Sequence, residues 1–193
     1  MHMKGKKIIL SLLIIVAMTF SVLSDINATE AGATPASKNL NITRYQQVKT
    51  NWCWAAAAQM IGKYLGSSKT QYQISTKVKG NSTNNSAASD SEVVSGIRYA
   101  VGNSYDCYYV GPKLYGDLEV LLGDLEIPQG IGMQWNGGGG HVVVVEGYTN
   151  DRRLRLVDPA NNCSKGKYYY TALVNGTTIQ SGDGYYTQTY VVE

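Results

Sequence analysis

The sequence predicts an α+β fold in which an N-terminal helical part packs on a C-terminal antiparallel β-sheet. Apolar residues in the first two thirds of the chain recur at helical spacing. From Gln129 onward, short apolar and tyrosine-rich runs are separated by Gly, Asn and Asp turns, which is typical of strands. Helices followed by strands in a chain of 193 residues, 44% of them hydrophobic, favour one α+β domain with a single core.

The first 28 residues are predicted to be a secretory signal peptide. Three lysines between positions 4 and 7 precede the apolar run 8–23, and Ser24 and Ala28 are small residues at suitable cleavage points. The alternative is an uncleaved membrane anchor, for which about 16 apolar-type residues are slightly short. We therefore expect a secreted protein, extracellular or at the cell surface, with no stable membrane insertion after signal cleavage.

Signal cleavage also changes the charge and the histidine count. Lys+Arg falls from 17 to 14 and Asp+Glu from 14 to 13, so the net charge falls from +3 to +1. A nearly neutral domain gives no support for a nucleic-acid partner or for binding to a membrane surface. His141 is the only histidine that remains once His2 is removed.

Residues 29–44 are predicted to form a flexible linker or a short propeptide, because they are polar, contain a proline and show no periodicity. The folded domain is predicted to span residues 45–193. Its first element is a buried, alanine-rich helix that begins near Cys53, with Thr50 or Asn51 as the N-cap.

The remaining elements follow from periodicity and turn residues. The segment 80–91, rich in Asn and Ser, is predicted to be a surface loop. Leucines at helical spacing predict a helix over 114–125. The other expected elements are helices at 72–78 and 91–100 and strands at 106–110, 131–135, 141–148, 153–159, 167–174 and 185–193.

Cys53, His141 and Asp158 are candidates for a catalytic set. A cysteine attacks a carbonyl carbon only as thiolate, and the N-terminus of a helix stabilises that anion. An imidazole must hold the proton and return it to the leaving amine, and His141 is the only one available. Asp158 ends the next predicted strand, so antiparallel pairing of the two strands puts it beside His141.

Two further features surround this set. Gln47 stands six positions before Cys53, and its side-chain amide is suited to join the Cys53 N–H in holding a tetrahedral oxyanion. The four glycines at 137–140 are expected to form a flexible loop beside a cleft, with Trp135 as one wall of the site.

Each of these residues also has a purely structural explanation. Cys53 can be a small hydrophobe on an apolar helix, His141 a hydrogen-bonded histidine at a strand edge, and Asp158 an ordinary turn residue before a proline. Asn161 and Asn162 are alternative residues for orienting the imidazole.

The cysteines and the histidine do not form a metal-binding pattern. There is no CxxC or HxxxH spacing and a single histidine in the mature chain, so neither a metal nor an organic cofactor is expected. An odd number of cysteines in an exported protein leaves at least one thiol free or paired with another chain. Cys107 and Cys163 either form a disulfide or remain two thiols.

The combined pattern resembles the papain-like cysteine peptidases, most of all their compact bacterial secreted forms. The residues that carry the resemblance are Gln47, Cys53–Trp54 opening a helix, Gly140–His141 opening a strand, and Asp158–Pro159 after the next strand. The resemblance implies a papain-like fold in which the catalytic helix packs on the sheet. It also implies that the cysteine is the nucleophile, the histidine the base, the aspartate the orienting residue and Gln47, rather than Gln46, the oxyanion donor.

Two departures from that family pattern stand out. The papain signature has a glycine before the dipeptide around the cysteine, whereas Asn51 and Trp52 stand there in this chain. The interval from Cys53 to His141 is shorter than in papain and the cathepsins, so the large insertions of those long forms are missing.

The sequence thus predicts a secreted cysteine endopeptidase that acts as a monomer on a protein or peptide substrate. Peptide bonds are hydrolysed through a Cys-His-Asp triad with a Gln oxyanion residue, without a cofactor. One alternative is a cell-wall peptidoglycan amidase or endopeptidase with the same Cys–His chemistry. The other is a non-enzymatic secreted binding module.

Overall fold

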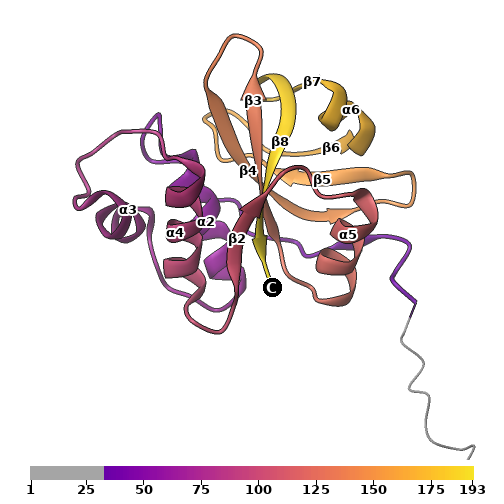
Figure 1. Ribbon diagram of the computed structural model, residues 1–193, viewed down its shortest axis with the longest axis horizontal. Coiled ribbons are helices and arrows are strands. Elements are labelled where there is room, and N and C mark those ends of the chain that lie inside the picture. Colours follow the sequence, from indigo (N-terminus) through magenta and orange to yellow (C-terminus); the bar gives the residue numbers. More distant parts are fainter. Residues whose placement is uncertain (1–32) are drawn as a thin grey trace, which may run out of the picture. The chain divides into compact units, whose positions relative to one another are not determined.

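The computed structural model describes residues 33–193, so the predicted signal peptide at 1–28 lies outside the described residues. Residues Thr34–Glu193 form one compact unit. Its three longest helices lie together beside an antiparallel sheet (Figure 1). They are α2 (Cys53–Tyr64), α3 (Gln71–Lys79) and α4 (Asp90–Val101). The predicted α+β class, with helices first and the sheet second, is confirmed.

Helix α2 is the centre of the helical part because its small residues allow close packing. Residues 54–62 are all buried, and a Cβ added at Gly62 would lie 2.9 Å from the Cβ of Ala100 on α4. The backbones of α2 and α4 therefore approach closely at this point. The prediction of Thr50 or Asn51 as N-cap is wrong, because both side chains bond to the loop that precedes α4 instead.

The sheet is antiparallel throughout, and within the described residues it has eight strands. Six of them lie in the order β2-β8-β3-β4-β5-β6, while β1 pairs with β4 and β7 pairs with β8. The strands are β1 (Lys38–Asn39), β2 (Cys107–Val110), β3 (Gln129–Trp135), β4 (Gly140–Tyr148), β5 (Arg153–Val157), β6 (Lys165–Tyr169), β7 (Thr177–Ile179) and β8 (Gly182–Val192). β4 lies inside the sheet and also packs against α2, which explains its continuous apolar run.

Several predicted elements need correction. The predicted helix at 114–125 consists of α5 (Tyr115–Glu119) and a π-helical turn, η1 (Val120–Asp124). The predicted strand at 167–174 is wrong in its second half, because β6 ends and helix α6 (Tyr170–Asn175) follows. Leu173 is completely buried in this helix. In an extended edge strand successive side chains alternate between the two faces, and burial of Leu173 would not be ensured.

The folded domain begins before the predicted boundary at residue 45. Lys38 and Asn39 pair with the end of β4, and Leu40 and Ile42 are buried in the core. The main-chain N–H of Ile42 donates to the buried carboxylate of Glu146 at 2.8 Å. The prediction of a flexible linker at 29–44 is therefore wrong for residues 38–42. Two apolar side chains two positions apart point to the same side of an extended chain, and their burial is enough to fix a short segment against the sheet.

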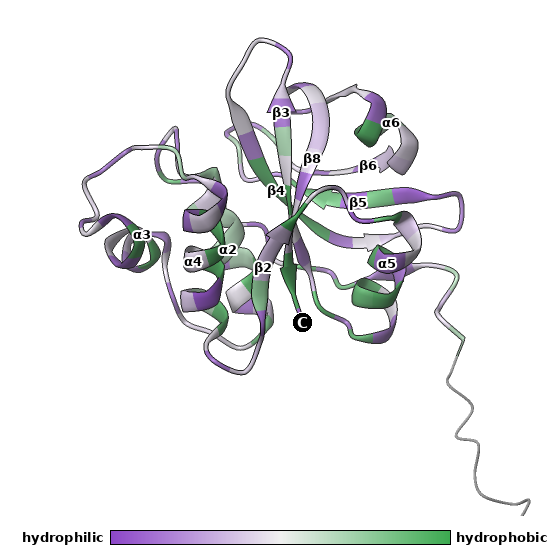
Figure 2. Ribbon diagram, viewed as in Figure 1, coloured by the Kyte–Doolittle hydropathy of each residue, from purple (hydrophilic) through white to green (hydrophobic). Residues whose placement is uncertain are grey.

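The hydrophobic core lies between the helices and the sheet. Figure 2 shows hydrophobic residues concentrated on α2 and β4, which meet in the middle of the unit. Trp52, Trp54, Tyr148 and Tyr186 are among its largest fully buried side chains. In the part of the chain that the structure describes, no helix has both the length and the hydropathy that a membrane span requires.

Candidate active site

Cys53 is the first residue of α2 and is half-buried. Its main-chain N–H has no acceptor within the helix, because the first N–H groups of a helix point out of its end. The tryptophans on either side are fully buried, and their indole N–H groups donate to the carbonyls of Asn84 (2.7 Å) and Ser86 (3.3 Å). The loop at 80–89 is thereby tied to the start of α2, and its end forms one wall of a cleft beside Cys53.

The hairpin between β3 and β4 positions His141 at the opposite wall. Gly138 and Gly139 have φ values of +90° and +79°, in the left-handed region that favours glycine. The predicted glycine loop is therefore a tight turn that directly precedes β4. The register places His141 opposite Met133 on β3, and both residues line the same cleft as Cys53.

His141 and Asp158 meet diagonally across β4 and β5. Val144 pairs with Val157, so Asp158, one residue further, lies on the same face as His141 and two positions from direct register. The Nε2 of His141 lies 2.8 Å from the Oδ1 of Asp158, and both side chains are buried. The ring partner is thus Asp158 and not Asn161, and Nδ1 is the ring nitrogen that remains for Cys53.

The two partners shift each other's titration. Burial lowers the pKa of His141, but hydrogen bonds and charge interactions with Asp158 and Cys53 outweigh burial and raise it from 6.5 to about 9. Burial raises the pKa of Asp158, yet the hydrogen bond and the charge of His141 hold it below its ordinary value. At neutral pH the ring is therefore an imidazolium and its partner a carboxylate.

Trp135, expected to wall the site, covers the imidazole of His141. The two rings are stacked, with centroids 5.7 Å apart and an interplanar angle of 20°. Trp135 is the last residue of β3 and is half-buried. Its indole removes water from one face of the imidazole, which strengthens the hydrogen bond to Asp158.

Arg44 holds the loop that carries Asp158, although the sequence placed it in the linker. Its guanidinium donates to the main-chain carbonyl of Asp158 at 2.6 Å and to that of Ala160 at 2.5 Å. The main-chain N–H of Gln47 donates to the carbonyl of Pro159 at 2.8 Å. Asp158 Oδ1 also accepts from the N–H of Ala160 at 2.9 Å. The segment before α2 thus fixes the turn at the end of β5.

Gln47 lies in that same segment, and its amide braces the main chain before α2. Its Nε2 donates to the carbonyls of Lys49 (3.0 Å) and Thr50 (2.7 Å), while its Oε1 is buried without a hydrogen-bond partner. Both amide N–H groups are therefore engaged by main-chain oxygens. To stabilise an oxyanion, one of these N–H groups must leave its main-chain carbonyl and donate to the oxyanion instead. The oxyanion role of Gln47 therefore stays a prediction.

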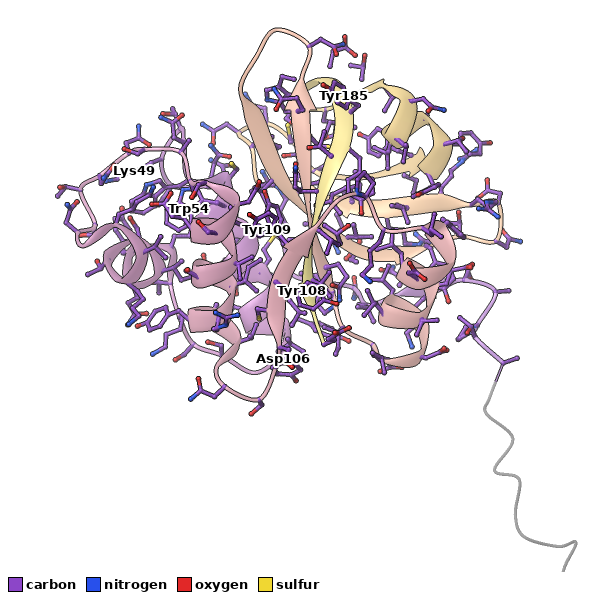
Figure 3. The ribbon with its side chains drawn as sticks, in the orientation of Figure 1. Lys49, Trp54, Asp106, Tyr108, Tyr109 and Tyr185 are labelled. Atoms are coloured by element: carbon purple, nitrogen blue, oxygen red, sulfur yellow. The ribbon has the colours of Figure 1, made fainter. Side chains whose placement is uncertain are left out.

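The cleft beside Cys53 has a volume of about 390 Å³ and lies where α2, the loop before α4, and strands β3, β4 and β8 converge. Asp90 is the only carboxylate among the residues that line it, and no lysine or arginine lines it in the part of the chain described. Asp158 lies behind His141 and does not line it. Figure 3 shows Trp54 on the helical side and Tyr109 between β2 and α4.

The other two cysteines are set apart from the cleft. All three cysteines of the chain are free thiols, so the disulfide considered for Cys107 and Cys163 is not formed. Burial raises the pKa of Cys107 to about 11, which makes this thiol unreactive. Among residues 33–193, no group of three or more His, Cys, Asp or Glu side chains is placed to hold a metal ion.

In a comparison with known families, residues 39–190 match the Peptidase_C39 like family. The match starts at the second residue of β1 and ends in β8, so it includes the described helices, nearly the whole sheet and every candidate site residue. No curated protein matches the chain.

Three solved structures share the fold at low sequence identity. The peptidase domain of Streptococcus ComA, a bifunctional ABC transporter of a quorum sensing pathway, has a TM-score of 0.57 and 16% identity over 77% of this chain and 95% of that one. A double glycine motif protease from an AMS/PCAT transporter, in complex with the leader peptide, has a TM-score of 0.54 and 16% identity over 80% and 93%. A structure described as a C39-like peptidase from Bacillus anthracis has a TM-score of 0.55 and 11% identity over 80% and 97%.

Proposed function

Because the chain belongs to the C39-like peptidase family, and is thus a cysteine-type peptidase, we propose that it hydrolyses peptide bonds with Cys53 as nucleophile. His141 is the acid and base of this reaction, and Asp158 orients its ring. The hydrogen bond of 2.8 Å from His141 to Asp158 carries the proposal, because it commits Nε2 to the carboxylate and leaves Nδ1 for the thiol in the same cleft.

In the proposed reaction the proton of Cys53 Sγ already resides on His141 Nδ1, in keeping with the imidazolium form of the ring at neutral pH. The sulfur then attacks the peptide carbonyl carbon, and the carbonyl oxygen becomes an oxyanion held by the N–H of Cys53. We propose Gln47 as the second donor, with its amide exchanging a main-chain carbonyl for the oxyanion. As the tetrahedral intermediate collapses, the imidazolium donates its proton to the leaving amine and the C–N bond breaks.

Hydrolysis of the acyl-enzyme follows the same route in reverse. His141 takes a proton from water, the hydroxide oxygen bonds to the acyl carbon, and the C–S bond breaks to release the carboxylic acid. The stacked Trp135 and the fixed turn at Asp158 support this cycle, since both hold the ring in one orientation.

We further propose a protein or peptide as substrate and export of the chain. A peptide substrate is supported by the fold-related double glycine motif protease, whose structure contains a leader peptide. Export is supported by the sequence pattern of residues 1–28 alone.

The proposal is tested by digesting a peptide library and purified cell wall in parallel with the wild type, Cys53→Ala and Cys107→Ala. We expect the wild type and Cys107→Ala to cleave peptides and Cys53→Ala to be inactive, because Cys107 is buried and does not line the cleft. Iodoacetamide should label Cys53 and thereby stop cleavage. Peptide hydrolysis by Cys53→Ala would refute the nucleophile, and cleavage of cell wall alone would favour the peptidoglycan alternative.

A further inference from the structure

One wall of the catalytic cleft carries a carboxylate that the proposed reaction does not use. Asp90 is the first residue of α4 and lines the cleft together with Cys53 and His141. Its Oδ1 accepts a hydrogen bond of 2.7 Å from the hydroxyl of Tyr190 on β8. This bond joins the helical wall of the cleft to the sheet wall and fixes where the carboxylate lies.

The second oxygen of Asp90 is left for a ligand. Among the described residues, Oδ2 has no hydrogen-bond partner, and no lysine or arginine lies within 4 Å of the carboxylate. Because Asp90 is only partly buried, this oxygen is not shut inside the protein. A structural explanation of Asp90 is that an acidic residue in the first turn stabilises the helix dipole. Glu92 already provides such a residue in α4, so the dipole does not require Asp90.

The surroundings of Asp90 are shaped to admit a side chain. Gly132 on β3 leaves room beside the Tyr190 hydroxyl, because a Cβ there would lie 3.1 Å from that oxygen. Tyr109 pairs with Tyr190 across β2 and β8, so both rings are on the same face, and Tyr109 is 48% exposed. Figure 3 shows Tyr109 between β2 and α4. Tyr190 lines the cleft but is only 4% exposed, so it positions the Asp90 carboxylate through its hydroxyl rather than offering its ring face to a ligand.

The distribution of charge in the cleft also favours a positively charged ligand. The Cys53–His141 pair is neutral overall when the proton has moved from sulfur to nitrogen, and the remaining lining residues are uncharged apart from Asp90. Asp90 therefore sets the charge that a bound peptide meets beside the scissile bond.

We propose that Asp90 makes this cleft selective for peptides with a basic side chain, lysine or arginine, close to the scissile bond. The inference rests on the proposed peptidase function and assigns its substrate class. A bound ammonium or guanidinium donates to Asp90 Oδ2, while Tyr190 keeps Oδ1 in place.

The test uses N-acetylated fluorogenic peptides in which each position within three residues of the scissile bond carries lysine, norleucine or glutamate in turn. Acetylation ensures that the only cation is the side chain. We expect lysine to exceed norleucine by roughly 10-fold or more in kcat/KM at one position, with glutamate lowest. Asp90→Asn, which keeps the shape and an acceptor for Tyr190, should reduce the lysine-to-norleucine ratio to near one.

Asp117→Asn is the matched control, since Asp117 is also a first-turn acid but lies exposed on α5, away from the cleft. It should leave both the rates and the ratio unchanged. If the wild type cleaves all peptides equally at every position, or if Asp90→Asn retains the lysine preference, the inference is wrong while the peptidase function stands. If no peptide is cleaved in a Cys53-dependent manner, both proposals fail.

Discussion

The hydrogen bond between His141 and Asp158 predicts a specific change in pH dependence when the carboxylate is removed. In wild type the pKa of His141 is raised to about 9, so the imidazolium, which protonates the leaving amine in the proposed reaction, persists well above neutral pH. Asp158→Asn keeps the size of the side chain and an oxygen acceptor but removes the charge. The pKa of His141 should then fall, because burial of the ring, which lowers it, is opposed by Cys53 alone.

The magnitude follows from the two pKa values. The rise from 6.5 to about 9 corresponds to about 3 kcal/mol, since one pK unit is about 1.4 kcal/mol. Because the folded pKa exceeds the unfolded one, this stabilisation is complete below pH 6.5 and is lost as the pH rises through about 9. Wild type should therefore lose up to about 3 kcal/mol of unfolding free energy between pH 6 and pH 10 from this group, and Asp158→Asn clearly less.

Two measurements check this prediction. The alkaline limb of kcat/KM should move from near pH 9 in wild type to at least one unit lower in Asp158→Asn. An NMR titration of the His141 ring, in wild type and in Cys53→Ala, separates the part due to the carboxylate from the part due to the thiol. The reasoning is refuted if Asp158→Asn leaves the alkaline limb and the ring titration where they are in wild type.

Three further predictions concern the supports of the site. Arg44→Met removes both hydrogen bonds to the Asp158 turn and should lower kcat by roughly 10-fold with little change in KM, as measured by steady-state kinetics; an unchanged kcat would contradict a positioning role. Trp135→Ala uncovers the imidazole and should reduce kcat/KM by roughly 10-fold, whereas full activity would show that the stacked ring is dispensable. Gly62→Val places atoms 2.9 Å from Ala100 and should destabilise the domain by about 1–3 kcal/mol in urea unfolding, with wild-type stability as the contrary result.

The sequence could predict the helix at Cys53 and the strand at His141 because their signals are local. Alanine-rich helical spacing and an unbroken apolar run each indicate an element without knowledge of its neighbours. The approach of His141 and Asp158 could also be predicted, since adjacent antiparallel strands bring their opposite ends together. The assignment of Asp158 over Asn161 needed the actual register and turn.

The parts that could not be predicted depend on long-range contacts. Arg44 carries no local signal, and its hydrogen bonds to Asp158 and Ala160 join residues more than one hundred positions apart. Asp90 looks like an ordinary first-turn acid until Tyr190 is placed against it. The polar composition of residues 80–89 predicts a surface loop but not its attachment to the start of α2. That attachment depends on the indole N–H groups of Trp52 and Trp54, which come from another part of the chain.

The attachment of β1 to the sheet and of Arg44 to the Asp158 turn sets a limit on how far the N-terminus of the folded domain can be trimmed. A processing cut before Lys38 leaves the pairing with β4 intact. A cut after Ile42 would remove two buried apolar side chains and one of the two hydrogen bonds to the buried carboxylate of Glu146, leaving it the ion pair with Lys165. One that also removed Arg44 would remove two of the hydrogen bonds that hold the turn carrying Asp158, the proposed orienting residue. A cut that the fold tolerates and a cut that disturbs the proposed site would then be separated by only a few residues of chain.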